Sequence, residues 1–159
     1  MFAQDEAIIK LNPTMRKVYA PKGTKPIRLV NGSKQKLYLF SVVSDEGNHC
    51  CTYDWINSDN FLKFVRYLLR MHKKIVLIVD RATWHTSEKV KDFVKKNKER
   101  LILWKFPKKL PELNPAEAGW KSARMNITYK LFKNTKKMGW AIKSHIRREF
   151  KVNLLRFWS

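Results

Sequence analysis

The sequence predicts an α/β domain built on a mixed five-stranded sheet with helices on both faces. Three observations support this class: a hairpin-like pattern near the N-terminus, an alternation of apolar strand runs with helical periodicity after it, and helical periodicity at the C-terminal end. We expect the first three strands to pair antiparallel and the later strands, which alternate with helices, to pair parallel. With 159 residues, of which 44% are hydrophobic, the chain suits one domain with its own core.

The N-terminal part is expected to supply three strands. Residues 1–9 form the first, which contains Asp5. Residues 10–35 are basic and broken by proline and glycine, which predicts a loop, with a short strand at Ile27–Val30. Two strand-like runs then flank the turn cluster at residues 44–48, which is typical of a β-hairpin.

The next segment alternates helix and strand. Asn57 or Ser58 caps a helix whose apolar residues recur with helical spacing: Phe61, Phe64, Val65, Leu68 and Leu69. Residues 74–80 and 101–106 are expected strands, and a helix beginning at Ser87–Glu88 lies between them.

Two helices are expected to complete the domain. A long basic helix begins near Asn114, and its apolar side is formed by Trp120, Ala123, Ile127 and Leu131. The last helix covers residues 135–150 and turns Trp140, Ile142 and Ile146 inward. No linker or repeat divides the chain, so residues 1–159 are expected to be a single domain.

Charge points to a polyanionic partner. The chain has 34 Lys and Arg against 13 acids, a net charge of +21, of which +6 lies in residues 1–80 and +15 in residues 81–159. Such a surplus repels itself unless a polyanion binds, and nucleic acid is the leading candidate. A membrane surface or a merely basic soluble surface are weaker alternatives, because no segment shows a separate amphipathic anchor.

The cysteines and the N-terminus indicate the compartment. Cys50 and Cys51 are adjacent, which disfavours a bond between them, and we expect reduced thiols in a cytoplasmic protein. No cluster of Cys and His suggests zinc. No stretch is apolar enough to span a bilayer, and the first residues do not form a signal peptide.

Three acids stand out by position. Asp5 lies in the first strand, Asp80 ends a central strand, and Glu117 lies in the first turn of the helix that follows the last strand. A carboxylate at the centre of a covered sheet is costly unless a cation neutralises it, and oxygen ligands favour Mg²⁺ or Mn²⁺. Two such ions, about 3.5–4 Å apart, can support an in-line phosphoryl transfer.

Each acid also has a simpler interpretation. Asp80 can cap the turn after its strand, and Asp5 followed by Glu6 can be a solvated strand edge. Asn114, Pro115 and Glu117 form a capping-box pattern that explains the glutamate without catalysis. His85 can satisfy a turn hydrogen bond. Taken singly, these alternatives stay open.

Three segments together resemble the catalytic domain of mariner-like transposases and their bacterial insertion-sequence relatives in the DDE superfamily. They are FAQDEAIIKLNPTMRKVYAPKGTKP at residues 2–26, IVLIVDRATWHTS at 75–87 and FPKKLPELNPAEAGWKSAR at 106–124. The third segment, with its Leu-Asn-Pro-x-Glu core, is the most specific. The 36 residues between Asp80 and Glu117 also fit the spacing of this group.

The resemblance implies an RNase-H-like fold, as in retroviral integrases, and a metal triad of Asp5, Asp80 and Glu117 holding two Mg²⁺ ions, for which Mn²⁺ can substitute. It implies metal-dependent cleavage of double-stranded DNA at transposon ends, followed by attack of the freed 3′-hydroxyl on target DNA at a TA dinucleotide. It also implies a nucleoid-associated homodimer, although no interface signal is evident. The family's helix-turn-helix modules, which read the transposon ends, have no counterpart in these residues.

Basic residues near the motifs are the expected DNA contacts, through phosphates rather than bases: Arg81, His85, Lys108, Lys109, Lys121, Arg124 and Lys130. Arg81 stands where many relatives have asparagine, so it could contact DNA or weaken metal binding. Two rival functions stay open. One is a stand-alone RNase-H-like nuclease, and the other is a non-catalytic DNA-binding remnant or truncated transposase.

Overall fold

The computed structural model describes residues 1–12, 19–25, 27, 32–108, 110, 113–128 and 130–158. The short strand expected at Ile27–Val30 falls mostly outside these ranges, and so does Lys109. Residues 19–25 are exposed and form neither helix nor strand, in agreement with the loop expected there.

Five strands form one mixed sheet in the order β3-β2-β1-β4-β5: β1 (Phe2–Lys10), β2 (Lys36–Val43), β3 (His49–Tyr53), β4 (Ile75–Val79) and β5 (Leu101–Lys105). The first three strands pair antiparallel, and β1, β4 and β5 pair parallel. The predicted sheet is therefore confirmed. Its centre is β1, the strand with Asp5.

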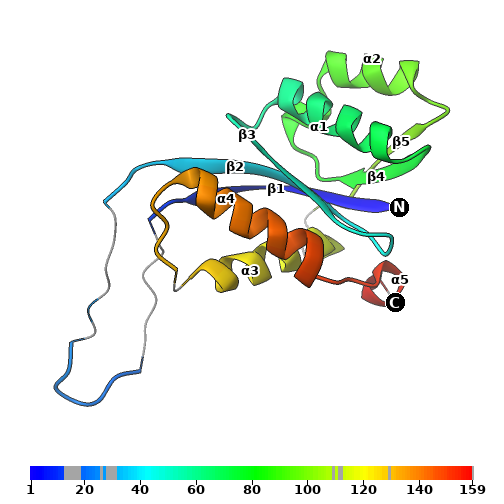
Figure 1. Ribbon diagram of the computed structural model, residues 1–159. Helices are drawn as coiled ribbons and strands as arrows, with labels where there is room; N and C mark the ends of the chain where they lie inside the picture. The colour runs from blue at the N-terminus through cyan, green and yellow to red at the C-terminus, as the bar shows by residue number, and fades with distance from the viewer. Residues whose placement is uncertain are drawn as a thin grey trace.

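Helices cover both faces of the sheet (Figure 1). On one face lie α1 (Ser58–Met71) and α2 (Glu88–Lys96), and on the other lie α3 (Pro115–Ile127) and α4 (Thr135–Ser144). Short elements complete the chain: the 3₁₀ turn η1 (Thr83–His85), the π-helical turn η3 (His145–Glu149) and α5 (Leu154–Trp158). In the described part of the chain, no helix has the length and apolarity to cross a membrane.

The helix boundaries follow the expected capping signals. The side chain of Asn57 accepts a hydrogen bond from the backbone N–H of Asn60, so Asn57 is the N-cap of α1. The five apolar residues expected on the inner face of α1 are all buried. Asn114 caps α3 in the same way, with Pro115 in its first turn.

Two expectations for the last helices are wrong. Leu131 is 55% exposed because α3 ends at Ile127, so its apolar stripe does not continue. Trp140 is 69% exposed, while Ile142 and Ile146 are buried. Residues two apart on a helix differ by about 200° in direction, so Trp140 and Ile142 cannot share the inner face.

Alternation along β1 sends neighbouring side chains to opposite faces of the sheet. Phe2 packs in the apolar cluster under α1, whereas Ala3 and Ala7 pack in the two clusters on the side of α3. Asp5 has the same parity as Ala3 and Ala7, and Glu6 has the parity of Phe2. The acidic pair is therefore divided between the two faces.

Candidate active site

Asp5 lies in the middle of the sheet, at a gap in the apolar packing under α3. Along β1 it separates Ala3 of one apolar cluster from Ala7 of another, and its partner on β2 is Ser41. Burial raises the pKa of Asp5 to about 7, and the nearby charges of Glu6, Asp80 and Glu117 add to the shift. The site therefore disfavours a bare carboxylate, whose charge either a proton or a bound cation would neutralise.

Asp80 follows the last residue of β4. Its Oδ1 atom accepts two hydrogen bonds, from the backbone N–H of Ala82 at 2.9 Å and from Nδ1 of His85 at 2.8 Å. Its pKa is lowered, first by the hydrogen bond from His85 and also by that from Ala82. The turn-capping interpretation is therefore confirmed for Oδ1, and it leaves Oδ2 without a protein hydrogen bond in the described residues.

Glu117 is placed by the N-cap of α3. The Asn114 side chain accepts from the backbone N–H of Ala116 at 3.1 Å, and its Nδ2 donates to the carbonyl of Gln4 at 3.1 Å. One buried side chain thus joins the first turn of α3 to the residue before Asp5. The Glu117 side chain itself is exposed, and the reciprocal bond of a capping box is not formed within the described chain. Its carboxylate is free for another role.

The three acids line one cavity of about 450 Å³. Its walls come from the middle of β1, the segments after β4 and β5, and the first turn of α3. Residues far apart in the sequence therefore meet at one edge of the central strands. Three carboxylates are hard oxygen donors of the kind that binds Mg²⁺ or Mn²⁺. Within the described chain, however, Asp5, Asp80 and Glu117 do not bring an oxygen of each within 4.8 Å of the others, so they share the cavity without forming a closed ligand set.

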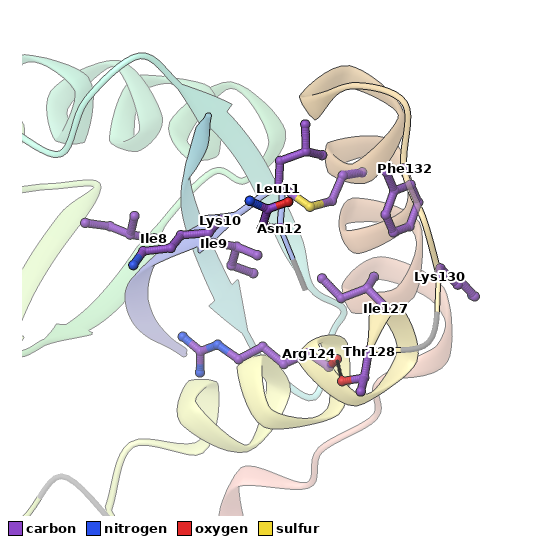
Figure 2. A pocket seen from close by; sticks show the side chains of 11 residues that line it. Ile8, Ile9, Lys10, Leu11, Asn12, Arg124, Ile127, Thr128, Lys130 and Phe132 are labelled. Carbon is purple, nitrogen blue, oxygen red and sulfur yellow. Dashed lines mark hydrogen bonds between the residues drawn. The ribbon is translucent and has the colours of Figure 1, made fainter. Parts of the chain in front are cut away.

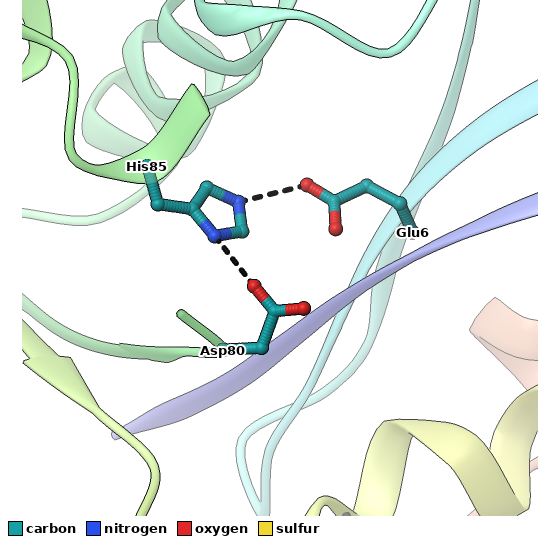
Figure 3. Close-up of side chains that lie close together, drawn as sticks. All are labelled: Glu6, Asp80 and His85. Atoms are coloured by element: carbon teal, nitrogen blue, oxygen red, sulfur yellow. Dashed lines mark hydrogen bonds and ion pairs between the residues drawn. The ribbon is translucent and has the colours of Figure 1, made fainter. Parts of the chain in front are cut away.

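His85 lies behind this cavity, on the α1 side of the sheet. Its Nε2 atom is 2.9 Å from Oε1 of Glu6, and its Nδ1 atom is 2.8 Å from Oδ1 of Asp80 (Figure 3). Burial opposes a charge on His85, yet the hydrogen bonds to Asp80 and Glu6 raise its pKa to about 9. A raised pKa favours the imidazolium form, in which both ring nitrogens donate to the carboxylates.

Glu6, Asp80 and His85 form the one group with metal-ligand proximity found in the described chain, since one oxygen or nitrogen of each lies within 4.8 Å of the others. Both ring nitrogens of His85 are already within hydrogen-bond distance of a carboxylate oxygen, Nδ1 of Asp80 and Nε2 of Glu6. We interpret the group as a histidine bridge between two acids. His85 is also only 1% exposed, so the direct DNA contact expected of it does not fit the structure.

The other expected DNA contacts lie around the carboxylates. Arg81 and Lys108 line the same cavity as the three acids. Lys121 and Arg124 line a second cavity that shares Asp5, Asn114 and Glu117 with the first. Because they share lining residues, the cavities adjoin.

A third cavity continues from the second, and Arg124 lines both. Figure 2 shows Arg124 on α3 and Lys130 on opposite sides of this cavity. All of these basic side chains are exposed. They border a furrow that passes the carboxylates, which suits a phosphate backbone.

Arg81 does not neutralise the acids beside it. Its Nε donates to the carbonyl of Phe106 at 3.1 Å, and no ion pair joins it to Asp5, Asp80 or Glu117 in the described chain. The guanidinium is held at the wall of the cavity, which favours a contact with an incoming phosphate over a competing role against metal binding.

A comparison with known protein families then settles the relationship. The family model of the DDE superfamily endonucleases matches residues 1–139. The chain belongs to this family. It is also 27% identical over 133 residues to the "Insertion element IS630 uncharacterized 39 kDa protein" of Shigella sonnei, covering 80% of this chain and 38% of that protein.

Solved structures confirm an RNase-H-like, transposase-type fold for this DDE family member. The Mos1 transposase paired-end complex with left transposon end matches with a TM-score of 0.72 at 17% identity, over 99% of this chain and 49% of the Mos1 chain. The HTLV-2 integrase catalytic core domain in complex with magnesium matches with a TM-score of 0.51 at 8% identity, over 72% of this chain and 76% of the integrase domain. The chain thus spans 38% of the insertion-element protein and about half of the Mos1 chain.

The sequence does not reveal one part of this candidate site. It marks Glu6 only as the neighbour of Asp5, and His85 only as a turn residue or a DNA contact. Strand alternation places Glu6 on the opposite face from Asp5, and this was the available signal. The partner on that face could not be read from the sequence, because His85 follows 79 positions later.

Proposed function

We propose that residues 1–159 form the catalytic domain of a DDE transposase, which cleaves DNA at the ends of an insertion element and joins the freed 3′-hydroxyl to target DNA at TA. One observation carries the proposal: Asp5, Asp80 and Glu117, from three separate elements, line a single cavity. The DDE family membership and the transposase-like fold support it.

Two divalent ions bound there would stabilise the attacking and leaving oxygens of an in-line phosphodiester exchange. The protein residues provide the frame for that exchange. Asp5 presents a carboxylate whose raised pKa favours cation binding, and Asp80 presents the oxygen that is not used in its turn. Glu117 lines the same cavity from the first turn of α3. No Ser or Tyr nucleophile is required.

The furrow beside the carboxylates would hold double-stranded DNA. Arg81 and Lys108 lie at the cavity, and Lys121, Arg124 and Lys130 follow along the adjoining cavities. Lysine and arginine contacts to phosphates position the duplex without reading its sequence. The net charge of +21 supports the same partner.

The test compares Asp80→Asn with the wild type in Mg²⁺- or Mn²⁺-dependent strand cleavage and strand transfer. Asp80→Asn should abolish both reactions and leave DNA affinity unchanged, because the change removes a ligand and no basic contact. Asp92→Asn, the same substitution at an exposed position on α2, is the matched control and should be fully active.

Three outcomes separate the rival functions. Cleavage without any strand transfer by the wild type would favour a stand-alone nuclease. If the wild type neither cleaves nor transfers strands, and soaked crystals hold no Mn²⁺ in the cavity, a DNA-binding remnant would be favoured. Undiminished cleavage by Asp80→Asn would reject the metal role of this residue.

A further inference from the structure

A second acid and a histidine support the catalytic carboxylates from the other side of the sheet. Glu6 and His85 lie on the face covered by α1, behind the cavity that holds Asp5, Asp80 and Glu117. The Glu6 side chain is only 5% exposed and the His85 side chain is fully buried. Burying an ion pair costs desolvation free energy, and this pair lies next to Asp80, a proposed catalytic carboxylate. This position indicates a functional role for the pair.

The contacts form a chain of hydrogen bonds that ends on Asp80. Oε1 of Glu6 accepts from Nε1 of Trp84 at 3.1 Å and from Nε2 of His85 at 2.9 Å. The other ring nitrogen of His85 lies 2.8 Å from Oδ1 of Asp80. Trp84 therefore orients Glu6, Glu6 orients His85, and His85 orients Asp80.

The turn that carries the histidine is itself fastened to the helix layer. The His85 ring packs against the ring of Phe61 on α1, with centroids 4.5 Å apart. The hydroxyl of Ser58, at the start of α1, donates to the carbonyl of Trp84 at 3.0 Å. The position of the His85 ring is therefore fixed by α1. Through its hydrogen bond to His85, Asp80 is fixed to α1 as well.

We propose that Glu6 and His85 are positioning residues: they hold Oδ1 of Asp80 so that Oδ2 faces the metal cavity. The inference rests on the proposed function, because it needs Asp80 to be a metal ligand. Carboxylate ligands are commonly oriented by such outer contacts, and their loss typically costs about 10- to 100-fold in metal affinity. Glu6 also lines the second cavity, but its side chain is only 5% exposed and that of His85 is fully buried, so both act on a bound metal only through Asp80.

The experiment measures Mn²⁺ binding to the full chain by electron paramagnetic resonance of free Mn²⁺, without DNA. His85→Ala and Glu6→Ala should raise the Kd for Mn²⁺ about 10- to 100-fold. Glu6→Gln keeps an oxygen acceptor at the same position, so it should restore most of the affinity lost in Glu6→Ala. If His85→Ala does not fold by circular dichroism, His85→Gln replaces it, since its single amide nitrogen cannot occupy the positions of both ring nitrogens.

The matched control is His145→Ala. His145 lies in a comparable network, 2.7 Å from Glu149 and 2.8 Å from the hydroxyl of Ser122, but it does not line the metal cavity. It should lower the melting temperature without changing the Kd for Mn²⁺. A purely structural role of His85 would give the same result, which would overturn the inference.

The design separates this inference from the function beneath it. If the wild type binds no Mn²⁺, or Asp80→Asn binds it unchanged, the proposed function and the inference fail together. If Asp80→Asn loses binding while His85→Ala and Glu6→Ala keep the wild-type Kd, the inference alone fails.

Discussion

The two faces of the sheet are built differently. Under α1 and α2 one large apolar cluster includes residues of β1, β2, β4 and β5, and the buried Glu6–His85 ion pair lies beside it. Under α3 and α4 the apolar side chains form two clusters, and Asp5 and Glu117 lie between them. The face under α1 and α2 therefore supplies more of the apolar packing that stabilises the domain. The face under α3 and α4 has less of that packing, because charged side chains interrupt it.

The interruption follows the strands. On β1 the order is Ala3, Asp5, Ala7, and on the paired strand β2 it is Val43, Ser41, Leu39. The outer residues of each set belong to the apolar clusters, and the middle residues are polar. A stripe of polar side chains therefore crosses an apolar face at one level, which is the level of the cavity lined by the three acids.

Substitution of Asp5 should have the largest effect on function. Asp5→Asn is expected to lower strand cleavage by roughly a thousandfold, or about 4 kcal/mol in activation free energy, because a metal ligand is lost. The free energy of unfolding should not fall, since burial already disfavours the charge that the change removes. Cleavage kinetics and urea unfolding measure the two effects, and retained cleavage would contradict the assignment.

A substitution in the apolar cluster under α1 should instead lower the stability of the fold. Phe64 is fully buried under α1 and contacts the ring of Phe40. Phe64→Ala should lower the free energy of unfolding by about 3–5 kcal/mol, from lost transfer energy and the cavity left behind. Urea denaturation measures this, and Met71→Ala, at a position 59% exposed on the same helix, should change it by only about 0.5 kcal/mol.

The buried Glu6–His85 ion pair should make stability depend on pH. The pKa of His85 rises from 6.5 to about 9 on folding, so its contribution is fully present below pH 6.5 and is lost as the pH rises through 9. The difference in melting temperature between the metal-free wild type and His85→Gln should therefore be larger at pH 6 than at pH 10. An equal difference at both pH values would show that the imidazolium does not form.

The smallest expected effect concerns the furrow on the interrupted face. Arg124→Ala should weaken DNA binding and reduce the slope of log K against log salt by about 1, because one phosphate contact is lost. Fluorescence anisotropy at several salt concentrations measures the slope. Lys95→Ala, on exposed α2 at the opposite face, is the control. Equal slopes for the two variants would place the DNA elsewhere.

Much of the fold was predictable because it depends on local patterns. Five strand segments, the cap at Asn57 and the start of α3 at Asn114 follow from apolar periodicity and capping chemistry, and the structure confirms them. The predicted burial of Trp140 and Leu131 was wrong, because burial depends on where a helix ends and which of its faces points to the core. The candidate triad itself came from its positions at strand and helix ends together with the resemblance.

The sequence by itself determined that this chain alternates strands with helices, carries a strongly basic surface, and places single acids at the ends or centres of buried elements. Only the tertiary structure decided that Asp5 of the Asp5–Glu6 pair lines the cavity with Asp80 and Glu117. It also decided that His85 connects Glu6 to Asp80. The physical reason is that strand alternation and helix periodicity are properties of nearby residues. A hydrogen bond across 79 positions exists only after the sheet has brought β1 and β4 together.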